Sequence, residues 1–123
     1  MARILVIDDE DGPRRVLSRA LQEAGHEVLE ASEGTAALQL HLASAAQLVI
    51  TDLYMPRMDG MEILMALRKL TPGIKIIAIS GGGQLSQPED ALETAQALGA
   101  YAAFAKPFHL RRLLETVEEA LAA

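Results

Sequence analysis

The sequence predicts a single α/β domain built on a parallel β-sheet, and three observations support this fold class. Short apolar runs alternate five times with longer segments of helical periodicity along the 123 residues, as expected when helices connect parallel strands. Some of the apolar runs are continuous, which is typical of strands covered on both faces. The length suits one compact domain that buries roughly two-thirds of its unfolded surface.

Each predicted strand is a short apolar run. The five runs are Ile4–Ile7, Val28–Leu29, Leu48–Ile50, Ile74–Ile79 and Ala102–Ala105. The second run lies within the more polar segment HEVLEAS, which predicts an edge strand because one side of such a strand meets solvent.

Each predicted helix is a segment whose apolar residues recur every three to four positions. Gly12 and Pro13 precede the first helix, and proline is favoured in a first turn. Gly99 follows the fourth helix, where glycine commonly ends a helix. In helix order, the recurring apolar positions are Val16, Leu17, Ala20, Leu21 and Ala24; Leu38 and Leu42; Ile63, Leu64, Leu67 and Leu70; Ala91, Leu92, Ala95 and Leu98; and Leu110, Leu113, Leu114, Val117 and Leu121.

The composition excludes several classes of protein. A net charge of −6 and a pI near 5.0 argue against a nucleic-acid partner, which usually requires a basic face. The absence of cysteine rules out a disulfide framework and suits a reducing compartment. The N-terminal MARILVIDDE does not resemble a signal peptide, and no run approaches the roughly 18 apolar residues of a membrane span. We therefore expect one cytoplasmic domain, residues 1–123, that contacts neither nucleic acid nor membrane.

Polar residues collect where four of the predicted strands end. Asp8 and Asp9 follow the first strand, Asp52 ends the third, Ser80 follows the fourth and Lys106 follows the fifth. Ligands of such sheets bind at the carboxyl ends of the strands, so we expect these side chains to lie together. An unpartnered buried carboxylate is costly, which leaves two interpretations of Asp52: it lies at the exposed mouth of its strand, or a cationic group meets it there.

The charges of this group favour a divalent cation and phosphoryl chemistry. Three carboxylates and one lysine sum to −2, and crowded like charges resist joint ionisation. Oxygen ligands suit Mg²⁺, with Mn²⁺ as an alternative, better than zinc. A carboxylate beside a metal, a lysine and a hydroxyl can accept a phosphoryl group while the cations offset charge on its oxygens.

These residues resemble those of the receiver domain of two-component response regulators. The resemblance rests on Asp8-Asp9-Glu10, the segment DLYMPRMDG that begins at Asp52, Ser80, and Lys106-Pro107-Phe108, and it covers essentially the whole chain. It implies a doubly wound (βα)5 flavodoxin-like fold with a parallel five-stranded sheet in the order 2-1-3-4-5. It also implies a stand-alone phosphoacceptor signalling domain, without an output domain and not a conventional enzyme.

The resemblance implies a role for each acidic residue. Asp52 matches the phosphoacceptor, which takes a phosphoryl group from the phosphohistidine of a histidine kinase or of a histidine phosphotransfer protein. Asp9 matches the direct Mg²⁺ ligand and Asp8 the acid that holds metal-bound water. Asp52 itself belongs to the metal site, and the backbone carbonyl of Tyr54 matches the third protein ligand. A change in partner binding upon phosphorylation, and slow loss of the phosphoryl group from Asp52, are then the expected activities.

The remaining motif residues match groups around the phosphoryl oxygens. Lys106 matches the lysine that contacts these oxygens, and Ser80 the hydroxyl that moves toward them. Gly81 matches the small residue that leaves room for the group, and the Lys106-Pro107 bond matches a cis peptide, which proline makes accessible.

Two features depart from the family pattern. The usual aromatic residue three positions before the lysine is replaced by Ala103, and strand alternation places Phe104 on the opposite face, as part of the core. Tyr101 shares the face of Ala103 but lies farther from the site. The segment GGGQLSQPED, after Ser80, is longer than usual and rich in glycine, which we interpret as flexibility.

Other interpretations need features that the sequence lacks. A small phosphohydrolase that uses Asp52 as its nucleophile would need a cap over its substrate, and 123 residues leave no room for one. A flavodoxin-like cofactor binder would need a glycine- and serine-rich phosphate loop where this chain has DDEDGP. The histidines have no metal-ligand spacing, so we expect His26, His41 and His109 to be solvated surface residues.

Overall fold

The chain folds into ten alternating strands and helices over the residues that the structure describes. The structure is a computed structural model that describes residues 1–53, 60–80 and 88–123, with the backbone alone for 88–92. The elements are β1 (Arg3–Ile7), α1 (Asp11–Glu23), β2 (Glu27–Ala31), α2 (Gly34–Ala43), β3 (Leu48–Asp52), α3 (Gly60–Leu70), β4 (Lys75–Ser80), α4 (Pro88–Ala97), β5 (Ala102–Ala105) and α5 (Leu110–Ala122).

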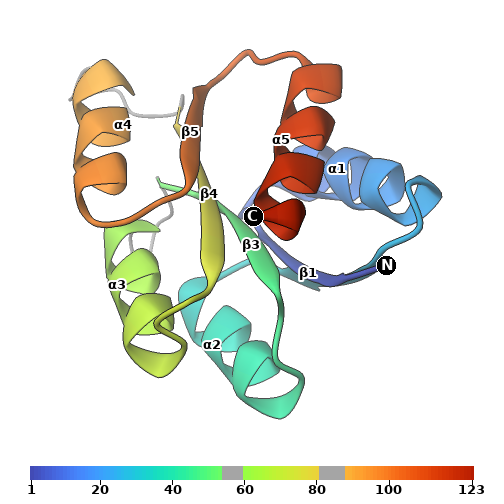
Figure 1. Ribbon diagram of the computed structural model, residues 1–123, viewed down its shortest axis with the longest axis horizontal. Coiled ribbons are helices and arrows are strands. Elements are labelled where there is room, and N and C mark those ends of the chain that lie inside the picture. Colours follow the sequence, from blue (N-terminus) through green and yellow to red (C-terminus); the bar gives the residue numbers. More distant parts are fainter. Residues whose placement is uncertain (54–59, 81–87) are drawn as a thin grey trace.

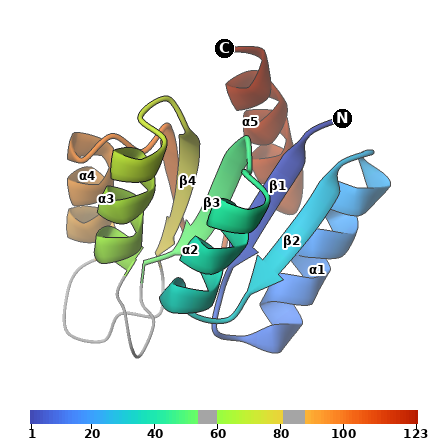
Figure 2. The same cartoon turned by 90° about the horizontal axis from the view of Figure 1, so that it is seen from below.

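The five strands form one parallel sheet in the order β2-β1-β3-β4-β5. This confirms the predicted fold class and the predicted order, with the polar strand β2 at an edge. The strands run in one direction through the domain (Figure 2). All their carboxyl ends therefore meet at the same edge of the sheet.

Helices cover both faces of the sheet (Figure 1), and each face has its own apolar core. On one face, α1 and α5 supply Leu17, Leu21, Leu113, Val117 and Ala120. On the other face, α2, α3 and α4 supply Ala37, Ile63, Leu64, Leu67 and Ala95. The central strands are buried on both sides, as their continuous apolar runs predict.

Several apolar residues that the helical periodicity predicts to be buried face solvent instead. Val16, Leu42 and Leu70 are exposed. In α1 the buried stripe passes through Arg14, Leu17, Ser18 and Leu21, and one residue along a helix turns the side chain by about 100°. Periodicity identified the helices correctly, but it did not select the buried residue among adjacent apolar ones.

The prediction that all three histidines are solvated was wrong for two of them. His26 and His41 are buried, and His109 alone of the three is exposed. His26 accepts a hydrogen bond at Nδ1 from the Ala2 amide and contacts Glu118 at 2.7 Å through Nε2. His41 accepts one from the Ala46 amide and contacts Thr71 Oγ1 at 2.8 Å. Hydrogen-bond partners on distant segments make burial of both rings tolerable.

The turn after α4 depends on the glycine that the sequence placed there. Gly99 has a φ of 108°, in the left-handed region that glycine adopts without strain. Its carbonyl accepts a hydrogen bond from the Arg68 guanidinium at 3.0 Å. A Cβ at this position would lie 2.5 Å from the guanidinium carbon of Arg68, but the end of that side chain can move aside, so it is the positive φ that favours glycine here.

Candidate functional site

The register of the sheet brings the polar strand ends together. Ile7, the residue before Asp8, lies beside Thr51, the residue before Asp52. Asp52 in turn lies beside Ile79, and Ser80 beside Ala105, the residue before Lys106. Neighbouring strands in this order lie about 4.8 Å apart. The chain positions predicted from the sequence therefore converge on one edge of the sheet.

Asp8, Asp9 and Asp52 form an acidic cluster. One carboxylate oxygen from each lies within 4.8 Å of the others. Asp8 and Asp52 are buried, whereas Asp9 is exposed. Three hard oxygen donors in this space, open to solvent on one side, suit a cation such as Mg²⁺ that retains several waters. The predicted third ligand, the Tyr54 carbonyl, lies outside the described residues, as do Gly81 and the rest of the glycine-rich segment before Pro88.

Lys106 is the cationic group that lies beside Asp52. Its Nζ lies 3.0 Å from Asp52 Oδ2, 3.6 Å from Asp8 Oδ2 and 3.9 Å from Glu10 Oε1. Partial burial acts to lower the pKa of Lys106, but the hydrogen bond and charge of Asp52, with Asp8 and Glu10, outweigh it and raise this pKa above its ordinary value. The ammonium therefore stays charged at neutral pH. Of the two sequence-based interpretations of Asp52, the exposed strand mouth was wrong, because Asp52 is buried. The other is confirmed, because a cationic group meets it there.

Ser80 places a hydroxyl at the same edge. The residue is fully buried, and within the described part of the chain its Oγ has no hydrogen-bond partner. An unsatisfied buried hydroxyl is uncommon and needs an explanation. A phosphoryl oxygen at this edge of the sheet would supply an acceptor.

The peptide geometry around Lys106 also follows the prediction. The Lys106-Pro107 bond is cis, and the Lys106 amide donates to the Ser80 carbonyl at 2.6 Å. β5 thus remains tied to the end of β4 where the lysine side chain leaves the sheet.

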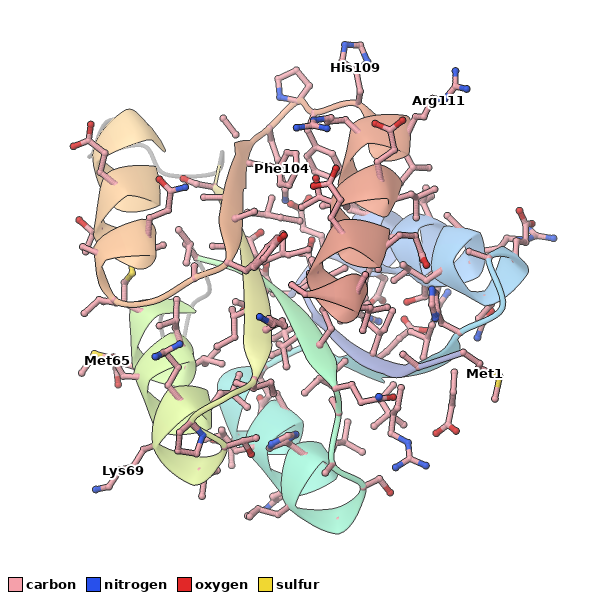
Figure 3. The ribbon with its side chains drawn as sticks, in the orientation of Figure 1. Met1, Met65, Lys69, Phe104, His109 and Arg111 are labelled. Atoms are coloured by element: carbon pink, nitrogen blue, oxygen red, sulfur yellow. The ribbon has the colours of Figure 1, made fainter. Side chains whose placement is uncertain are left out.

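Ala103 and Phe104 lie on opposite faces of strand β5, as strand alternation predicts. Ala103 packs against the core formed with α2, α3 and α4, whereas Phe104 packs against the opposite core. The ring of Phe104 lies between β5 and α5 (Figure 3), with its centroid 6.1 Å from that of Phe108. Tyr101 precedes the strand and lies under Lys75, whose Nζ is 5.4 Å from the ring centroid. Phe104 therefore has the core position that the sequence predicted.

Two residues that support the site had no assigned role in the sequence analysis. Arg14 donates to the Asp8 carbonyl at 2.9 Å. Gly60 begins α3 directly against the end of β3, where a Cβ would contact Leu53 Cα and lie 2.5 Å from the Asp52 carbonyl oxygen. Neighbouring residues in the sequence predict neither contact. The one local indication is the three-residue spacing of Asp11 and Arg14, which are paired on α1.

A doubly wound α/β domain with an acidic cluster, a lysine and a hydroxyl at the carboxyl edge of its sheet defines a class of protein, the phosphoacceptor signalling domains. Comparison with known proteins specifies the family. The response regulator receiver domain matches residues 4–118, and the chain belongs to this family. It is therefore a receiver domain of the two-component type, which acts in phosphorelay signalling.

The relatives include both short and long proteins. The chain is 42% identical to the sensor kinase CckA of Brucella abortus over 98% of its length, but it spans only 12% of that protein. It is 35% identical to the response regulator receiver protein CpdR of the same organism, with 100% of this chain and 99% of that one covered.

Solved structures agree with the family and the fold. The receiver domain of NtrX from Brucella abortus has a TM-score of 0.89 and 33% identity, with 98% of each chain covered. As a family, receiver domains take phosphoryl groups from histidine kinases and bind Mg²⁺ at an acidic pocket. They are signalling domains and not conventional enzymes, which leaves the phosphohydrolase and cofactor-binder interpretations without support.

Proposed function

We propose that Asp52 is the phosphoacceptor of this receiver domain and that Asp8, Asp9, Asp52 and the Tyr54 carbonyl hold its Mg²⁺. The observation that carries the proposal is the position of Asp52, which is only 4% exposed yet lies 3.0 Å from Lys106 Nζ. Burying an ionised carboxylate is costly, and such buried charged groups are concentrated at functional sites. Here the acid and its counter-ion lie at the one edge of the sheet that holds the acidic cluster.

The reaction is transfer of a phosphoryl group from a phosphohistidine nitrogen. A carboxylate oxygen of Asp52 attacks phosphorus, and the phosphorus–nitrogen bond breaks with its electron pair left on the imidazole. The product is an acyl phosphate on Asp52. Mg²⁺, when bound, offsets negative charge on the phosphoryl oxygens.

The protein groups orient and neutralise the same phosphoryl oxygens. Lys106, held charged by its carboxylate neighbours, can move its ammonium from the Asp52 carboxylate to a phosphoryl oxygen. Ser80 Oγ, without a partner in the described part of the chain, can donate its hydrogen bond to another. Loss of one Lys106–Asp52 contact and gain of one at Ser80 changes the carboxyl edge of the sheet, which is the change that a downstream protein partner reads.

The proposed partners follow from this chemistry. The donor is a histidine kinase or a histidine phosphotransfer protein of the cytoplasm, and the reader is a protein that distinguishes the phosphorylated edge. The domain contributes its own phosphorylation and slow autodephosphorylation, and no turnover of an external substrate. In the described residues, no helix has the length and apolar character needed to cross a bilayer.

The test is phosphorylation of the purified protein by a small phosphoramidate donor in the presence of Mg²⁺. The parent should gain one phosphoryl group by intact mass, and Asp52→Asn should gain none while it keeps the same circular dichroism spectrum. Glu23→Gln, which changes an exposed carboxylate on α1, is the control and should be phosphorylated like the parent. Phosphate incorporation by folded Asp52→Asn would show that another residue accepts it.

A further inference from the structure

Arg14 is a charged residue with little access to solvent. It lies in the first turn of α1 with 10% of its side chain exposed. Arginine is rarely buried to this extent unless it is paired. Each of its three guanidinium nitrogens donates one hydrogen bond: Nε to Glu30 Oε1 at 3.0 Å, Nη2 to Asp11 Oδ1 at 2.6 Å and Nη1 to the Asp8 carbonyl at 2.9 Å.

The charge of Arg14 is already compensated away from the site. Asp11 and Glu30 supply two carboxylates to one guanidinium, so little of its positive charge remains for the acidic cluster. The third bond goes to an uncharged carbonyl. The contribution of Arg14 to this part of the molecule is therefore one of geometry.

The carbonyl that Arg14 holds belongs to the peptide unit between Asp8 and Asp9. That unit is planar, so a hydrogen bond to its oxygen restrains the backbone of both residues. The other groups of Asp8 are held as well: its amide donates to the Ala31 carbonyl at 3.1 Å, and its Oδ1 accepts from the Glu10 amide at 2.9 Å. Asp8 Oδ2 then faces Lys106 Nζ at 3.6 Å.

We propose that Arg14 is a positioning residue that fixes the Asp8–Asp9 peptide plane and thereby orients both carboxylates for Mg²⁺. This inference rests on the proposed function, in which Asp8 and Asp9 hold the metal. Groups that orient metal ligands commonly change metal affinity 10- to 100-fold when they are removed, by order of magnitude. Lysine cannot replace Arg14, because an ammonium on a flexible chain lacks the planar fork that joins Glu30, Asp11 and the carbonyl.

The test compares Mg²⁺ titrations of metal-free protein, followed by amide chemical shifts, for the parent, Arg14→Lys and Arg14→Ala. Arg14→Lys and Arg14→Ala should each raise the Kd for Mg²⁺ about tenfold. Arg19→Lys is the matched control, because Arg19 lies on the same helix with 83% of its side chain exposed, and its Kd should equal that of the parent. Glu30→Gln removes a charge but leaves the Asp8 bond, so it should also bind normally.

A second measurement does not depend on the metal. In metal-free Arg14→Lys, the Glu10 amide should exchange its hydrogen about tenfold faster than in the parent, because the peptide plane beside its acceptor is no longer held. Circular dichroism identifies any variant that fails to fold.

Other outcomes would contradict either the positioning role of Arg14 or the proposed metal site. Normal Mg²⁺ affinity in folded Arg14→Lys, with weak binding in Arg14→Ala alone, assigns the effect to charge and overturns the positioning role. Mg²⁺-induced shifts in the parent that avoid Asp9 and Asp52 overturn the proposed metal site instead. In that case the hydrogen-exchange rate of the Glu10 amide in metal-free protein still tests whether Arg14 holds the peptide plane. An unchanged rate in Arg14→Lys overturns that role.

Discussion

Lys106 contributes to phosphoryl chemistry as well as to the stability of the fold. Its ammonium meets Asp52 at 3.0 Å, and Asp52 is only 4% exposed, so Lys106→Ala leaves a buried carboxylate without its cation and should cost about 3 kcal/mol of unfolding free energy. The folded variant also lacks a charge at the reacting group, so it should be phosphorylated about 100-fold more slowly than the parent.

Rates of phosphorylation and urea denaturation curves, measured on the same samples, separate the effect of Lys106→Ala on phosphoryl transfer from its effect on stability. Lys69→Ala is the control, because Lys69 points away from α3 into solvent (Figure 3), and it should change neither quantity. Collapse of stability in Lys106→Ala with phosphorylation intact would make Lys106 a structural residue.

His41 should make the domain sensitive to mild acid. Burial lowers the pKa of its imidazole below the ordinary 6.5, so the folded state favours the neutral ring. Above the ordinary pKa both states are neutral and the contribution is complete; as the pH falls, the unfolded state takes up the proton first and stability is lost. The steepest loss from one such group is about 1.4 kcal/mol per pH unit.

Urea denaturation at about pH 7.5 and about pH 5.5 measures this loss. His41→Gln should be less stable than the parent at the higher pH but should lose less stability between the two. His109→Gln, at an exposed position, should follow the parent. Equal losses in the parent and His41→Gln would assign the acid sensitivity to other groups.

At the scale of elements, the junction of β3 and α3 is the most constrained part of the site. The Gly60 amide donates to the Leu53 carbonyl at 3.0 Å, and a side chain at Gly60 would press on the backbone of Asp52 and Leu53. Backbone atoms cannot move aside like the end of a side chain, so Gly60→Ala should cost about 1–3 kcal/mol.

Gly73→Ala is the matched control for this substitution. Nothing lies within 4 Å of a Cβ built at Gly73, so this variant should be as stable as the parent. Gly60→Ala should also shift the Asp52 amide resonance, whereas Gly73→Ala should not. A stable Gly60→Ala variant with an unchanged Asp52 resonance would refute the close approach.

At the scale of the whole molecule, Mg²⁺ should stabilise the folded domain. A cation that binds the assembled cluster of Asp8, Asp9 and Asp52 does not find it in the unfolded chain, where Asp52 is far from the adjacent Asp8 and Asp9. Binding then raises the unfolding free energy by about 1.4 kcal/mol at about ten times the Kd.

Thermal unfolding with increasing Mg²⁺ measures this effect, and a chelator should remove it together with phosphorylation. Asp9→Asn should show little gain, because it lacks the proposed direct ligand. An equal rise of the unfolding temperature with Mg²⁺ in the parent and in Asp9→Asn would place the metal elsewhere.

The sequence by itself determined the architecture and the main residues of the site. Hydrophobic periodicity is a local property of the chain, and it identified each strand and helix found in the described residues. The direction of parallel strands then required Asp8, Asp9, Asp52, Ser80 and Lys106 to meet at one edge, as the register shows. The match to receiver domains gave the strand order.

Only the tertiary structure decided which polar residues are buried and what supports the site. His26 pairs with Glu118, 92 positions away, and His41 with Thr71, 30 positions away. Arg14 joins α1 to Glu30 of β2 and to the Asp8 carbonyl. Such contacts depend on how elements pack and in which register, and periodicity along the chain carries no information about either. A polar side chain is tolerated inside when packing brings a partner to it, and that partner is absent from its local sequence.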